Sequence, residues 1–93
     1  MKYILMGMLD RDWIGRHKER VEESMAKAKE FGIEFESIYY TQGQYDFIDI
    51  IEASDPYVVL AFSMWYAKNG YGRIMTMPAF DEPTIERVDD MTI

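Results

Sequence analysis

The pattern of apolar and polar positions predicts a strand and then a helix at the start of the chain. Residues 2–8 form a short apolar run that ends before a charged segment, which favours a strand. A helix is expected to follow, from a cap at Asp10 or Asp12 to Gly32, because aspartate suits a helix start and glycine a helix end. At about 100° per residue its apolar side chains share one face: Trp13, Ile14, His17, Val21, Ser24, Met25, Ala28 and Phe31.

A hairpin is predicted in the middle of the chain. Residues 33–41 begin by alternating apolar and polar side chains, as a half-buried strand does. Gln42-Gly43-Gln44 has the composition of a hairpin turn, so residues 45–53 are expected to be the return strand.

A second helix and a last strand complete the pattern. Asp55-Pro56 combines a helix cap with a proline at the first helical position, and Asn69-Gly70 ends the helix. Residues 71–80 are predicted to form the last strand. The acidic residues 81–93 are expected to be a tail, either a short helix or an arm.

The predicted order is β-α-β-β-α-β over a single domain of 93 residues, which is the ferredoxin-like α+β pattern. It gives a four-stranded antiparallel sheet with both helices on one face. The other face would then be bare. Two such sheets commonly cover each other, so a dimeric α+β barrel, or a higher homo-oligomer, is expected.

The second helix also indicates association, because apolar side chains surround its whole axis. A surface helix normally has a polar face. A domain of this size buries only about 60–65% of the surface of its unfolded chain, so a neighbouring subunit is the expected cover. The residues predicted to lie at this interface are Phe62, Trp65 and Tyr66.

Charge and composition exclude several classes of function. The net charge of −7 disfavours nucleic acid and anionic membrane surfaces as partners. The chain has no cysteine, and its apolar N-terminal run is too short to cross a membrane, so a cytoplasmic protein is expected. One histidine among scattered acids makes no convincing metal site, and no phosphate-binding loop is present. No cofactor is therefore predicted.

A resemblance to a known family starts at the hairpin. Gly43-Gln44-Tyr45-Asp46 resembles the G-x-Y-D signature of the GYD domain family. The resemblance continues through Glu52-Ala53-Ser54-Asp55 and an alanine-containing helix, resumes at Gly72-Arg73 and ends at Ala79-Phe80. It implies membership of the dimeric α+β barrel group, in agreement with the predicted topology.

The resemblance implies no single function. The wider group includes cofactor-free monooxygenases, isomerases, haem-binding enzymes and ligand-sensing modules, and a fold alone does not choose among them. The chain also departs from the family pattern. It has the bulky Trp65 and Tyr66 where small residues are usual, and Asp49 where an apolar residue is usual.

Asp49 is the first candidate for chemistry, because it interrupts an apolar strand. A buried carboxylate must be paired, neutral or next to a wet cavity. Burial would raise its pKa toward the range of a general base. The alternative is an ion pair with Arg73 or with a basic residue of a partner subunit. The pattern does not decide which sheet face Asp49 occupies, because both faces are largely apolar.

His17 is the second candidate, since it lies in the predicted apolar stripe of the first helix. It is either a core histidine satisfied by one hydrogen bond or a proton shuttle or ligand contact. An acid–base pair with Asp49 requires that Asp49 face the helices.

The hairpin motif and its neighbours give candidate ligand-binding residues: Tyr39, Tyr45, Asp46 and Arg73. A structural role in the turn is the favoured alternative for Gly43, Tyr45 and Asp46, because glycine permits positive φ and aspartate accepts backbone hydrogen bonds. Arg73 suits a carboxylate, either of a ligand or of an aspartate.

Three functions are therefore compared. The first is a small-molecule-binding module, or an accessory partner of a larger enzyme, with an organic ligand in a pocket lined by Tyr, Met and Phe. The second is a cofactor-independent isomerase or monooxygenase that uses Asp49 or His17 as general base. The third is a structural assembly adaptor.

Overall fold

A computed structural model describes all 93 residues of the chain. Its elements follow the predicted order, with one short 3-10 helix and one C-terminal helix added. They are β1 (Lys2–Leu9), η1 (Arg11–Trp13), α1 (His17–Glu30), β2 (Glu34–Tyr40), β3 (Phe47–Glu52), α2 (Pro56–Lys68), β4 (Gly72–Ala79) and α3 (Glu82–Met91).

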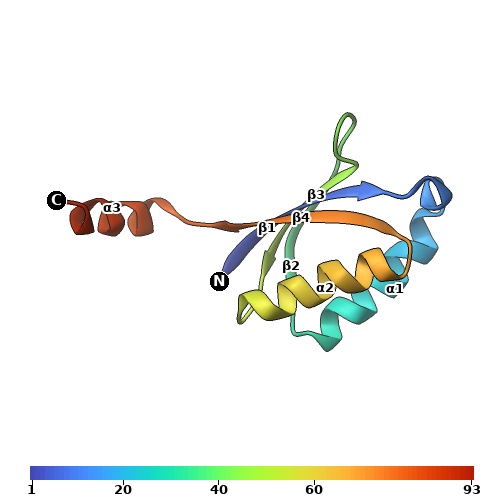
Figure 1. The fold of residues 1–93 in the computed structure, drawn as a ribbon, viewed down its shortest axis with the longest axis horizontal. Coiled ribbons are helices and arrows are strands. Elements are labelled where there is room, and N and C mark those ends of the chain that lie inside the picture. The colour runs from blue at the N-terminus through green and yellow to red at the C-terminus, as the bar shows by residue number, and fades with distance from the viewer.

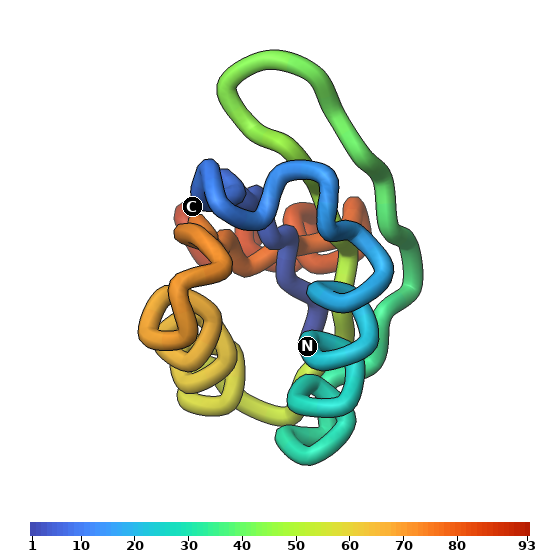
Figure 2. Tube along the Cα trace, turned by 90° about the vertical axis from the view of Figure 1, so that its right-hand side faces the viewer, coloured from blue at the N-terminus to red at the C-terminus, as the bar shows by residue number.

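The four strands form one antiparallel sheet in the order β2-β3-β1-β4. Helices α1 and α2 lie side by side on one face of this sheet (Figures 1 and 2). The hairpin between β2 and β3 extends away from both helices in both views. The architecture is the ferredoxin-like α+β fold that the sequence predicts.

The first helix differs from the prediction at its start. Asp10 caps only the short η1, by accepting a hydrogen bond of 3.0 Å from the backbone N–H of Asp12. Gly15 then adopts a φ of 88°, and α1 begins at His17. Ile14 is therefore exposed, and His17 is an exposed residue of the first helical turn instead of the middle of a buried stripe.

Helix α2 begins where Asp55 accepts hydrogen bonds of 2.8 and 3.2 Å from the backbone N–H groups of Tyr57 and Val58. Its inner side faces the sheet, with Val59, Phe62 and Tyr66 only 1–3% exposed. Because these residues lie three and four positions apart, they share one helix face. Phe62 and Tyr66 are thus core residues of this chain, and the interface role predicted for them is wrong.

Trp65 has a role within the chain that explains its size. Its ring lies 5.4 Å from that of Tyr71 and 5.9 Å from that of Phe62, and its side chain is half-buried. Its contribution to an interface stays a prediction. The exposed large apolar side chains of α2 are instead Tyr57, Leu60 and Met64.

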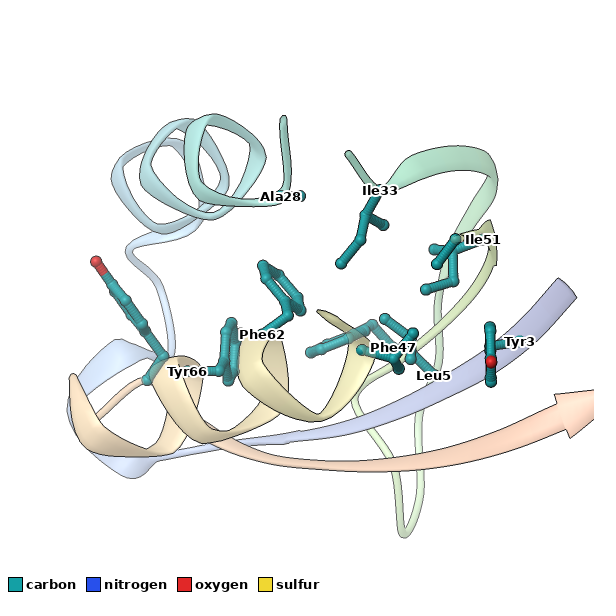
Figure 3. Close-up of a cluster of buried hydrophobic side chains, with 11 residues drawn as sticks. Tyr3, Leu5, Ala28, Ile33, Phe47, Ile51, Phe62 and Tyr66 are labelled. Atoms are coloured by element: carbon teal, nitrogen blue, oxygen red, sulfur yellow. The ribbon is translucent and has the colours of Figure 1, made fainter. Parts of the chain in front are cut away.

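The core lies between the helices and the sheet (Figure 3). Leu5 of β1 and Ile51 of β3 are completely buried at its centre. Gly7 faces Phe47 across the β1–β3 pair, and the phenyl ring lies where any side chain at position 7 would be. Glycine at position 7 therefore leaves room for the ring of Phe47 in the core.

The second face of the sheet has no helix over it. Residues that alternate with the core positions on β1, β3 and β4 point to this open face, and most are apolar. We call them the open-face residues: Ile4, Met6, Met8, Ile48, Ile50, Met75 and Met77.

Helix α3 projects beyond the body of the domain, at the end of β4 (Figure 1). Asp81 caps it by accepting a hydrogen bond of 3.0 Å from the backbone N–H of Thr84. Ile85, Val88 and Met91 form an exposed apolar stripe along it. The predicted tail is therefore a helical arm. None of the helices has the length and apolar run that crossing a bilayer requires.

Candidate functional site

Asp49 lies on the helix-facing side of the sheet. In the strand register it is opposite Leu5 of β1 and Ile38 of β2, so it shares a face with the core residues Phe47 and Ile51. It is only 6% exposed. The open question of its orientation is thus answered, and Arg73, which is paired with Met8 on the open face, cannot be its ion-pair partner.

Helix α1 contributes two more buried polar side chains to the same region. Arg20 and Ser24 are one helical turn apart and therefore lie one above the other. They are 5% and 7% exposed. A buried arginine, a buried serine and a buried aspartate thus face each other across the interior of a domain that is otherwise apolar.

A cavity of about 30 Å³ connects these three side chains. Its aromatic walls come from both sheet and helix and comprise Phe35, Tyr40, Phe47, Phe62 and Tyr66. Val21, Met25 and Ile38 complete it. At its mouth, the side chains of Met25, Ile38 and Tyr40 are 38%, 39% and 54% exposed, so a molecule from solvent meets an apolar rim first.

Each of the three polar side chains has a buried atom without a hydrogen-bond partner. These atoms are Nε of Arg20, Oγ of Ser24 and Oδ1 of Asp49. They are the complete set of such side-chain atoms in the protein, and all three residues line one cavity. A buried polar group without a partner costs about 1–3 kcal/mol, so three in one place make this cavity the candidate functional site.

The remaining contacts of Arg20 hold its guanidinium in place. Nη1 donates a hydrogen bond of 3.0 Å to the hydroxyl of Tyr66, and Nη2 lies 3.4 Å from Nδ1 of His17. The guanidinium carbon lies 5.6 Å from the ring centre of Phe47, within the range of a cation–π contact. Arg20 is therefore a fixed positive charge at the end of the cavity.

Arg20 and Asp49 do not form an ion pair, since no nitrogen and oxygen of the two come within 4.0 Å. Burial raises the pKa of Asp49 to about 7, although the charge of Arg20 opposes the rise. Burial also raises the pKa of the Tyr66 hydroxyl, again against the influence of Arg20. The carboxyl group is thus able to exchange a proton near neutral pH, as a general base must.

His17 lies beside the mouth of the cavity and not in its lining. Its ring packs edge-on against that of Tyr40, with 4.9 Å between the ring centres. The structure does not bring His17 and Asp49 together in the cavity. The expectation that His17 is a core residue pointing at the sheet is wrong, because α1 starts at this residue and its side chain is exposed.

The residues predicted around the hairpin lie away from the cavity. Tyr39 pairs with Ile48 and is on the open face with Arg73. The Tyr45 hydroxyl lies 3.0 Å from the Met75 sulfur. None of these three residues lines the cavity, and their roles in ligand binding stay predictions.

Asp46 has a clear structural contact. Its Oδ2 accepts a hydrogen bond of 2.7 Å from the backbone N–H of Leu9, and its own N–H donates one of 2.7 Å to the carbonyl of Gly7. It thereby fastens the hairpin to the end of β1. A ligand role for Asp46 also stays a prediction.

The sequence reasoning missed Arg20, Ser24 and Tyr66 as site residues. Ser24 belongs to the predicted apolar face of the first helix, where its hydroxyl gives no separate signal. Arg20 is four positions before Ser24 and three after His17, so the helical spacing places it on the same face. A charged residue on that face is the signal that would have identified it. Tyr66 is predicted at an interface because apolar side chains surround the whole axis of the second helix.

The fold and this cavity define a ferredoxin-like α+β domain with a polar site between α1 and the sheet. The model of the GYD domain family matches residues 10–88, and the chain belongs to this family. The resemblance seen around Gly43–Asp46 is thereby confirmed.

Comparison with solved structures supports the fold alone. The crystal structure of FFRP-DM1 is similar, with a TM-score of 0.58 and 18% sequence identity, over 85% of this chain and 97% of that one. A search of curated proteins gave no significant match.

Proposed function

We propose that this protein binds a small, partly apolar organic molecule in the cavity between α1 and the sheet. The observation that supports this function is the convergence of three unpaired buried atoms, on Arg20, Ser24 and Asp49, in one cavity. Apolar walls with a few converging polar groups are typical of small-molecule sites. The walls contain three Phe, two Tyr and one Met.

The size of the cavity limits what enters it. A volume of about 30 Å³ has room for about one water molecule, hence for one polar group of a ligand. The apolar body of the ligand would lie against Met25, Ile38 and Tyr40 at the mouth. Met25 has a flexible side chain that adapts to different shapes.

A larger groove of about 480 Å³ between α2 and β4 is the competing location. Its lining includes the exposed Tyr57 and Leu60 and the edge-strand residue Pro78. It contains no buried polar atom that lacks a partner, so nothing in it demands a polar ligand. We therefore assign the ligand to the cavity at Asp49. The groove suits an accessory or adaptor role, in which a larger protein covers α2.

A cofactor-independent enzyme is the second candidate function. Asp49, with its pKa raised to about 7 by burial, is a suitable proton acceptor. The fixed charge of Arg20 would stabilise an anion formed when the ligand loses a proton. Asp49 is the base in this proposal, because His17 does not line the cavity.

We further propose that the chain forms a homo-oligomer, a dimer in the simplest case, through the open face of its sheet. A contiguous apolar surface on a monomer usually marks an interaction site. A two-fold axis would place the same residues of both copies against each other, so an apolar face is self-complementary. The apolar side chains of β1, β3 and β4 on this face, such as Met6, Ile50 and Met77, have no helix over them within one chain, and Met77 is 41% exposed.

The oligomer is tested by light scattering on the purified protein. We expect a mass of at least twice the 11.0 kDa of one chain, and a shift toward 11.0 kDa in Ile50→Lys. Leu60→Lys, on the outer side of α2, is the control and should leave the mass unchanged. A wild-type monomer, or an oligomer that only Leu60→Lys disrupts, would refute the open-face interface.

Ligand binding is tested by native mass spectrometry of untagged protein purified from its own host. We expect a discrete extra mass per subunit, which Ser24→Leu abolishes because its side chain fills the cavity. Ala26→Leu, on the exposed side of the same helix, is the matched control and should keep the extra mass. An extra mass that survives Ser24→Leu would place the ligand elsewhere and refute the cavity assignment.

Asp49→Asn separates the two candidate functions. In an enzyme it abolishes turnover of the identified compound while the oligomer stays intact. In a binding module the compound is recovered chemically unchanged from the wild-type protein, and the substitution alters only its affinity.

A further inference from the structure

We infer that the group of the ligand that enters the cavity is a neutral hydroxyl, carried on an apolar body such as an aromatic ring. This inference rests on the proposed function and specifies the chemical class of its ligand. The supporting observation is the complementary hydrogen-bonding capacity of Arg20, Ser24 and Asp49, each of which is at least nine-tenths buried.

The unpaired atoms require a ligand group that is both a hydrogen-bond donor and a hydrogen-bond acceptor. The Nε–H of Arg20 can only donate, and an ionised Asp49 Oδ1 can only accept. Oγ of Ser24 is able to do either. A ligand group that satisfies Arg20 and Asp49 must therefore accept a hydrogen bond from one and donate a hydrogen bond to the other.

A hydroxyl meets both requirements with one heavy atom. Two hydrogen bonds of about 2.9 and 2.7 Å let a single oxygen bridge groups up to roughly 5.6 Å apart, which suits a pair that is not in direct contact. One oxygen also fits a cavity with room for about one water. If Asp49 is protonated, its O–H donates to the ligand oxygen and the ligand hydrogen bonds to Ser24, so the match does not depend on the charge of Asp49.

Other polar groups fit less well. A ketone or an ether only accepts, so it leaves an ionised Asp49 unpaired. An ammonium group only donates and would lie close to the guanidinium of Arg20. A carboxylate carries the same charge as an ionised Asp49 and needs room for three heavy atoms. The charges of Arg20 and an ionised Asp49 already balance, which favours a neutral group.

The walls determine the rest of the ligand. Eight of the eleven lining residues are hydrophobic, and the rings of Phe35 and Tyr40 belong to the sheet side of the cavity. Such a surface favours a flat apolar body, which it can contact through ring faces and edges. A phenol is the simplest compound that combines this body with a hydroxyl.

The experiment is a comparison of four monosubstituted benzenes on the wild-type protein: phenol, toluene, benzoate and benzylamine. Binding is followed by two-dimensional amide NMR titration, with the signals of Arg20, Ser24 and Asp49 as reporters of the cavity. We expect phenol to bind there at least about tenfold more tightly than each of the others, since two hydrogen bonds to buried groups distinguish it.

Two variants connect the preference to the cavity. Ser24→Leu should abolish the phenol shifts, while Ala26→Leu should keep them. Asp49→Leu should bring phenol and toluene to similar affinities, because the acceptor is lost. The wild-type comparison decides the matter even if a variant does not fold.

The possible results separate the inference from the proposed function. If toluene, benzoate or benzylamine shifts the cavity signals as tightly as phenol, the hydroxyl inference is overturned while a ligand-binding cavity stands. If no probe shifts the cavity signals and the native protein carries no extra mass, both are overturned.

Discussion

The guanidinium of Arg20 donates a hydrogen bond of 3.0 Å to the hydroxyl of Tyr66, and this contact joins α1 to α2 inside the protein. Both side chains are at least 95% buried. The contact anchors a buried charge that has no ion-pair partner, and it holds one end of the cavity. Stability and site geometry therefore depend on the same pair of residues.

Tyr66→Phe is expected to destabilise the protein by roughly 1.5–3 kcal/mol, the usual contribution of a hydrogen bond to a charged group. The phenyl ring keeps its packing, so the loss reports the hydroxyl alone. Urea denaturation of wild type and variant measures it. Tyr57→Phe is the control, because that tyrosine is 79% exposed and its hydroxyl has no partner. Equal unfolding free energies for Tyr66→Phe and wild type would show that the contact contributes nothing.

Asp49→Asn is expected to gain stability relative to wild type as the pH rises. Burial raises the pKa of Asp49 from 3.8 to about 7, so between these values the folded protein holds a proton that the unfolded chain has lost. The contribution of Asp49 to the unfolding free energy of the wild type is therefore fully present below about pH 4 and is lost as the pH rises through 7. The difference between the pKa values of Asp49 in the folded and the unfolded protein corresponds to at most roughly 4 kcal/mol of stability, at about 1.4 kcal/mol per pKa unit.

Urea denaturation at pH 5 and pH 8 tests this linkage. Asparagine has the same shape and no charge, so the difference between variant and wild type should grow in favour of the variant from pH 5 to pH 8. Asp90→Asn, on the exposed arm, serves as the control for the loss of one carboxylate. A constant difference between Asp49→Asn and wild type would contradict the raised pKa.

Most of the fold follows from local sequence signals. The Asp55-Pro56 cap and the hairpin turn at Gly43 are short-range features, and the structure places element boundaries within two residues of those predicted from them. The predicted start of α1 is wrong because Asp10, which has the features of a helix cap, does not cap α1. It caps η1, and Gly15 separates that turn from α1.

The site was less predictable because it depends on long-range packing. Asp49 was identified from one charge in an apolar strand, which is a local signal. Its sheet face depends on pairing with β1 and β2, and both faces of β3 are apolar. Tyr66 was predicted at an interface because a sequence does not show that the inner side of α2 is filled by its own chain. Its contact with Arg20 spans 46 residues.

Gly7→Ala is expected to be strongly destabilising, by at least about 3 kcal/mol, through overpacking of the core. A Cβ at position 7 would lie 1.9 Å from Cζ of Phe47, inside a ring that is itself 4% exposed. Gly15→Ala is the comparison, because no atom lies within 4 Å of its Cβ and only the positive φ of 88° is unfavourable. That substitution should cost about 1–2 kcal/mol.

A double variant identifies the clash as the cause. Phe47→Leu shortens the side chain over Gly7, so adding Gly7→Ala to it should cost less than Gly7→Ala costs in the wild type. Thermal denaturation of the four proteins gives the coupling. Strictly additive effects would mean that Gly7 matters for a reason other than the ring of Phe47.

Asp46→Ala tests whether the aspartate of the G-x-Y-D motif acts on structure. It removes the acceptor of the 2.7 Å hydrogen bond from the backbone N–H of Leu9, and that half-buried group would be left without this partner. We expect a loss of roughly 1–3 kcal/mol in the unfolding free energy, with a smaller loss for Asp46→Asn because the amide oxygen still accepts. Gln44→Ala, in the same turn, should leave the stability unchanged. Amide hydrogen exchange at Leu9 should accelerate in Asp46→Ala alone. Wild-type stability in Asp46→Ala, combined with weaker phenol binding, would instead assign the motif to the ligand.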